Sequence, residues 1–149
     1  MIPAAGVAAR VTAGVTATLM AVCAHAATPA QDYVLNCMGC HGTDAQGIPG
    51  KVPPLANALS RFMRSPEGRN YVLRVPGAAS SALSDEQLAA VLNWLAVTYD
   101  SSANATQPAP FTSTEVAAVR HQPLLAVLAT RNSVVHNLAI TGPSPPHQY

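Results

Sequence analysis

Cys37-Met38-Gly39-Cys40-His41 is the stretch of sequence that decides the fold. Two thiols three residues apart at the end of a predicted helix can each add to one of the two vinyl groups of a haem. The histidine that follows is then held beneath the iron as its proximal ligand. We therefore predict one covalently bound haem c, with Cys37 and Cys40 as attachment points and His41 as the metal ligand.

Three other uses of this cysteine pair compete with haem attachment: a thioredoxin-like dithiol, half of a zinc site and a structural disulfide. A dithiol enzyme needs strands alternating with helices around the pair, and the sequence has no such pattern. A zinc site needs further ligands, and the candidate histidines lie far away in a proline-interrupted tail. We interpret these histidines as ordinary surface residues: His121, His136 and His147.

Residues 1–26 have the pattern of a signal peptide. The single cation Arg10 precedes an apolar run over 11–22, and Ala24-His25-Ala26 has the small-x-small form that signal peptidase accepts. Cleavage there predicts an exported, periplasmic protein. An uncleaved membrane anchor and a lipoprotein acylated at Cys23 are the two alternatives, and the first would tie the protein to the membrane.

Length and charge limit the size of the core and the kind of partner. A chain of 149 residues has room for one small core, which a bound haem would complete. Loss of residues 1–26 leaves seven basic against seven acidic side chains, which argues against a nucleic-acid-binding protein.

Basic residues gather in one part of the sequence. Within 24 residues there are five cations and one acid, Glu67. The cluster is either a solvated face, or a set that pairs with haem propionates and attracts an acidic redox partner. Its members are Lys51, Arg61, Arg64, Arg69 and Arg74.

Apolar spacing predicts an all-α fold. The expected helices span 29–41, 55–63, 70–75 and 84–99, with an irregular loop over 42–54 and a turn at 65–68. The last of these helices opens on the capping-box pair Ser84 and Gln87.

The C-terminal part is expected to differ from this domain. We divide the mature chain into a domain over 27–100, a linker and helical extension over 101–140, and a disordered tail over 141–149. Within the extension, Thr112 and Glu115 have capping-box spacing, and a further helix is expected over 124–131.

Several motifs together resemble the class I c-type cytochromes, over about Asp32 to Tyr99. They are Tyr33, the Cys37 to His41 motif, the loop over 42–47, the Val52-Pro53-Pro54-Leu55 segment, and Leu83-Ser84-Asp85-Glu86-Gln87 at the start of the last helix. The resemblance implies a small cytochrome c-like helical domain wrapped around one covalently bound haem.

The resemblance also implies roles for individual residues. The carbonyl of Pro53 would face the ring nitrogen of His41 and fix its tautomer. Leu55 would pack on the haem, and Trp94 would lie near the first helix.

The sequence departs from this family in the expected ligand loop. Members usually carry a methionine there as sixth iron ligand, but residues 75–82 read Val-Pro-Gly-Ala-Ala-Ser-Ser-Ala. The nearest substitute is Met63, which we interpret as core packing because a thioether readily fills apolar gaps. An open sixth position is the alternative.

The function that follows is electron transfer between a periplasmic dehydrogenase and another cytochrome or an oxidase. One alternative is a haem enzyme, or a sensor of peroxide or a gas, with an open sixth iron position. No histidine or glutamate is placed as the acid/base that peroxide chemistry needs. Another alternative is a subunit whose extension over 111–131 grips a larger enzyme.

Overall fold

The structure of the chain, a computed structural model, describes residues 27–101 and 106–141. The predicted signal peptide and nearly all of the predicted tail lie outside these residues. The described part is helical, with no strand beyond one isolated bridge between Ile48 and Val52, so the all-α prediction is confirmed. None of the described helices is long and apolar enough to cross a membrane. The helices are α1 Pro29–Asn36, α2 Met38–His41, α3 Leu59–Phe62, α4 Pro66–Arg74, α5 Pro76–Ala79, α6 Asp85–Thr98, α7 Ser113–Val119 and α8 Val127–Thr141.

The predicted helix over 29–41 is divided in two at Cys37. Thr28 begins α1 with a complete capping box to Gln31. The backbone of Cys37 leaves the helical region, at φ −128° and ψ −39°, and α2 then forms one short turn. The prediction of a continuous helix was wrong at this residue.

The region between the loop and the last helix also differs from the prediction. The segment over 65–68, expected to be a turn, is the N-cap and first turn of α4. The hydroxyl of Ser65 accepts a hydrogen bond from the Gly68 amide at 3.0 Å, and Pro66 has the fixed φ that suits a first helical position. The helix predicted over 55–63 is shorter, because only α3 is regular.

The predicted capping box of α6 is confirmed, since the Ser84 and Gln87 side chains each bond the other residue's backbone. The aromatic residues of α6 and its C-cap pack against α1. Trp94 lies with its ring centroid 5.7 Å from that of Tyr33, and Tyr99 meets Trp94 edge-on at 5.7 Å. Trp94 therefore packs near the first helix, as expected.

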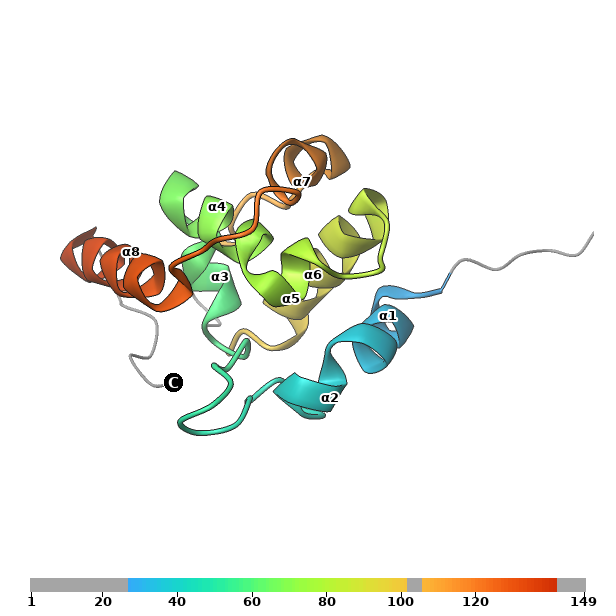
Figure 1. Cartoon of the computed structure of the whole chain (residues 1–149). Helices are drawn as coiled ribbons and strands as arrows, with labels where there is room; N and C mark the ends of the chain where they lie inside the picture. Colours follow the sequence, from blue (N-terminus) through green and yellow to red (C-terminus); the bar gives the residue numbers. More distant parts are fainter. Residues whose placement is uncertain (1–26, 102–105, 142–149) are drawn as a thin grey trace, which may run out of the picture.

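The C-terminal extension lies against the domain, where α7 packs on α6 and α8 packs on α4 (Figure 1). The hydroxyl of Thr112 caps α7, and the last helix starts at Val127, three residues later than predicted. Arg69 donates to both carboxylate oxygens of Glu115, at 2.6 and 2.5 Å, and its guanidinium lies 4.2 Å from the centroid of the Phe111 ring.

A second arginine also joins the extension to the domain. Arg120, at the end of α7, is only 3% exposed. It donates to the carbonyl oxygens of Ser81 at 2.7 Å and Leu83 at 2.8 Å, and to the carboxylate of Asp85 at 3.0 Å. These bonds fix the short connection between α5 and α6.

Replacing Arg120 by methionine should lower the free energy of unfolding by about 2 to 3 kcal/mol, because two carbonyl oxygens lose their partner without regaining water. Urea unfolding of the haem-loaded protein, followed by far-ultraviolet circular dichroism, measures this change. Arg64→Met is the control, because Arg64 is exposed. Equal stability of the two variants would contradict a structural role for Arg120.

Candidate functional site

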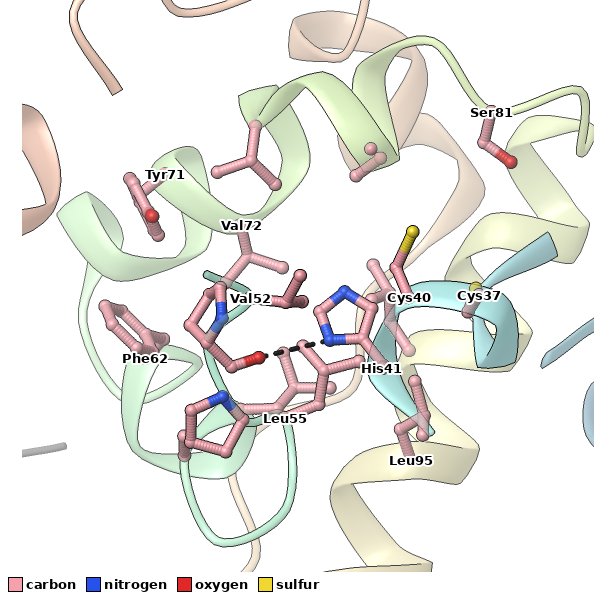
Figure 2. A pocket seen from close by; sticks show the side chains of 18 of the residues that line it. Cys37, Cys40, His41, Val52, Leu55, Phe62, Tyr71, Val72, Ser81 and Leu95 are labelled. Carbon is pink, nitrogen blue, oxygen red and sulfur yellow. Dashed lines mark hydrogen bonds between the residues drawn. The ribbon is translucent and has the colours of Figure 1, made fainter. Parts of the chain in front are cut away.

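A cavity of about 320 Å³ lies between α2 and the following loop on one side and α3, α4, α5 and α6 on the other (Figure 2). Its wall is mainly aliphatic and aromatic. Both cysteines of the motif line it as free thiols, Cys37 half-buried and Cys40 exposed. The aromatic rings of Phe62 and Tyr71 lie at the end away from these cysteines.

His41 projects into this cavity with its ring held by a backbone carbonyl. Its Nδ1 lies 3.1 Å from the carbonyl oxygen of Pro53, so the neutral ring donates from Nδ1 and keeps the lone pair on Nε2. Burial lowers the pKa of His41, while the hydrogen bond to Pro53 works against that effect. A neutral imidazole with a fixed tautomer is the form that ligates iron.

Glycine at position 47 allows the loop to bring Pro53 to His41. Gly47 has φ +68°, and its amide donates to the His41 carbonyl at 2.8 Å. A Cβ at this position would overlap the Val52 carbonyl oxygen and would lie 2.7 Å from that of Pro53. The loop therefore needs glycine both for its backbone angle and for this close approach.

The end of α2 is held by a buried tyrosine. The hydroxyl of Tyr33 donates to the carbonyl oxygen of Gly42 at 2.5 Å. Burial, with a smaller contribution from Tyr99, raises the pKa of Tyr33 to about 12, so this donor stays protonated. Burial also raises the pKa of the Cys37 thiol, with a further contribution from Asp32.

The cavity fits the haem that the motif predicts. Two thiols lie at one end, a neutral imidazole points between the walls, and Leu55 lies among the lining residues. The lining is apolar enough to exchange the water around a porphyrin plane for hydrocarbon contact. Among the described residues, no group of three His, Cys, Asp or Glu side chains is placed to hold a metal ion.

The last helix supplies two lining residues that the sequence did not indicate, Val127 and Arg131. Arg131 is 3% exposed, and its guanidinium lies 5.2 Å from the centroid of the Phe62 ring. Ninety positions separate it from His41, and no motif connects the two. Only the packing of α8 on α4 brings this cation to the cavity.

The basic cluster is not one face. Arg69 binds Glu115, and Arg74 donates to the Gln122 carbonyl at 2.5 Å and to Asn70 at 3.1 Å. Both side chains therefore attach the extension. Lys51 and Arg64 are exposed, and Lys51 also borders the cavity.

Met63 is core, as we interpreted it, since it is 3% exposed within the main apolar cluster. It lines a separate hollow beside Arg69 and Pro108, rather than the cavity that contains His41. His121 and His136 are exposed surface residues, as expected, and His147 lies outside the described residues.

Comparison with known proteins assigns a family to this arrangement. The model of the family described as "Cytochrome c" matches residues 27–98. Two similar relatives are both called cytochrome c-552, and both come from Thermus thermophilus. Each is 34% identical over 118 residues, a match that covers 66% of this chain and 90% and 80% of the respective relatives.

Replacing Gly47 by alanine should lower the free energy of unfolding by about 2 kcal/mol or more, because the new Cβ adds backbone strain to its overlap with the Val52 carbonyl. Chemical unfolding of the haem-loaded variant measures the loss. Gly39→Ala is a matched control within the motif, since a Cβ there meets nothing within 4 Å. A Gly47→Ala protein as stable as Gly39→Ala would show that the loop does not need glycine.

Proposed function

The chain belongs to the cytochrome c family, and on this premise we propose that it is a periplasmic shuttle that carries electrons from a dehydrogenase to a downstream acceptor. Family membership makes it an electron carrier that binds covalent haem c with iron. The donor, the acceptor, the compartment and the residues that hold the haem are the parts that we propose.

One observation carries the assignment of the site. His41 is held in one tautomer by the Pro53 carbonyl and points into the same cavity that Cys37 and Cys40 line. We assign the two thiols as haem attachment points and His41 as iron ligand. Pro53 orients the imidazole, and Leu55 packs on the porphyrin.

Electrons would enter and leave the haem at the edge bonded to Cys40. Cys40 is exposed, so the haem edge bonded to it comes close to a docked partner. The bound haem supplies an iron that alternates between the ferrous and ferric states. The buried side chains of α3, α4 and α6 that line the cavity would keep water from that part of the porphyrin plane.

Two cations of the cavity wall suit the carboxylates of the haem. The vinyl and propionate groups of the porphyrin lie on opposite edges, so attachment at the cysteines directs the propionates to the other end. Phe62 lies at that end, and Arg131 lies against its ring. We assign Arg131, with Lys51, to the propionates, because a buried guanidinium is stabilised by an anion.

Export fits this chemistry. A signal peptide over 1–26 would carry the chain across the membrane, and covalent attachment would keep the haem from dissociating outside the cytoplasm. If that segment stays uncleaved, the protein is membrane-anchored. The near-balanced charge of the mature chain argues against a nucleic-acid partner.

Replacing Cys37 or Cys40 singly by serine should weaken covalent haem attachment, and the double variant should abolish it. The double variant should also be unstable, because the haem completes the core. Denaturing gels stained for haem peroxidase activity measure attachment, with Met38→Leu as the control within the motif. A full-strength haem band in the double variant would contradict the assignment.

Electron exchange with an acidic donor should slow as salt rises, because the remaining exposed cations Lys51 and Arg64 attract it at long range. Arg64→Glu should slow the reaction at low salt and flatten its salt dependence. Stopped-flow reduction by the physiological donor measures both effects. Arg64→Gln should give a salt dependence of the rate between those of wild type and Arg64→Glu. A wild-type rate independent of salt would show that these cations form a solvated face and do not attract the donor.

A further inference from the structure

The wall of the cavity that faces the free ring nitrogen of His41 is aliphatic. Figure 2 shows Nδ1 turned to Pro53 and the second ring nitrogen turned the other way, toward α4 and α5. The lining residues that these helices contribute there include Val72, Val75 and Ala78. None of these side chains has an atom that could donate a lone pair to iron.

The connection between α4 and α6 leaves little chain for a ligand loop. Val75 is the C-cap of α4 and the N-cap of α5. Two backbone hydrogen bonds close the single turn of α5: the Ala79 amide donates to the Val75 carbonyl at 2.9 Å, and the Ser80 amide donates to the Pro76 carbonyl at 3.0 Å. Arg120 then fixes the carbonyls of Ser81 and Leu83. The wall is therefore a short, anchored piece of backbone rather than a loop that could bring in a distant side chain.

The sulfur and imidazole side chains of the described residues do not belong to this wall. Those that line the cavity are Cys37, Cys40 and His41 itself, and Met63 lines the other hollow. The hydroxyl of Ser81 accepts a hydrogen bond from the Leu83 amide at 3.2 Å. Tyr71 is stacked on Phe62, with ring centroids 5.3 Å apart, at the end away from the cysteines.

We propose that the face of the haem opposite His41 is a binding site for small uncharged diatomic ligands, of which carbon monoxide and nitric oxide are the chemical type. The wall of Val72, Val75 and Ala78 admits such a ligand because burying a neutral diatomic molecule costs little. An anion would lose its hydration against these aliphatic groups. This site rests on the proposed haem attachment and adds ligand binding to electron transfer.

The test uses the haem-loaded full-length protein as the cell processes it. The ferric protein should be high-spin by electron paramagnetic resonance. The reduced protein should bind carbon monoxide, seen as a shift of its absorption bands. Met63→Leu should leave both signals unchanged, and so should a chain that ends at Thr141, which removes His147.

Ala78→Met supplies a thioether from the proposed wall. It should convert the iron to low-spin and weaken carbon monoxide binding by about tenfold or more, because the position is then free for only a fraction of the time. Ala79→Met is the matched control on the same helix, since Ala79 does not line the cavity. It should behave as wild type.

The outcomes separate this inference from the proposed function. A wild-type protein that carries covalent haem but is low-spin and does not bind carbon monoxide would overturn the inference and leave electron transfer standing. Loss of that low-spin state in Met63→Leu or in the chain ending at Thr141 would identify the ligand. A protein without covalent haem would contradict the site assignment itself.

Discussion

The hydrogen bond between Nδ1 of His41 and the carbonyl oxygen of Pro53 is the interaction on which the site depends. It joins the end of α2 to a loop that contains no helix, across twelve positions of sequence. By using Nδ1 it leaves Nε2 to face the cavity, and it resists rotation of the ring. The glycine at 47, the bridge between Ile48 and Val52, and the hydroxyl of Tyr33 at Gly42 all serve to hold the two ends of this bond in place.

Core and functional site are largely the same structure in this protein. Leu59, Phe62, Tyr71 and Leu95 are buried residues of the apolar cluster and also line the cavity. The extension takes part in both roles, because Arg120 fixes the connection after α5 while Val127 and Arg131 close the cavity beside α4. A haem bound in this cavity would contact side chains that otherwise face a hollow, so we expect haem binding and folding to be coupled.

Features set by residues close together in the sequence, such as helix caps and motif spacing, could be predicted from the sequence. The capping pair Ser84 and Gln87 located the start of α6, and the three residues of the predicted site, Cys37, Cys40 and His41, line one cavity. The division of the first helix at Cys37 has no signature in composition, and the extent of α4 was missed because Ser65-Pro66 was interpreted as a turn instead of a cap. The roles of Arg69 and Arg131 were beyond sequence reasoning, because their partners lie far along the chain and meet only through helix packing.

The proposed open iron position is compatible with electron transfer, because hydrogen bonds hold the backbone of the wall that faces it. Carriers usually avoid open positions, since gaining or losing a water molecule with each electron adds to the reorganisation of the site. The aliphatic side chains of Val72, Val75 and Ala78 offer such a water no hydrogen-bond partner, and the nearby Ser81 hydroxyl is a single one, whereas a water molecule needs about two to four to be held. Backbone hydrogen bonds hold the turn of α5, and Arg120 holds the segment that follows it. The wall therefore resists a rearrangement that would bring in further hydrogen-bond partners for a water molecule. Coordination by His41 alone would then be the same in both oxidation states, which keeps reorganisation small while leaving space for a neutral ligand.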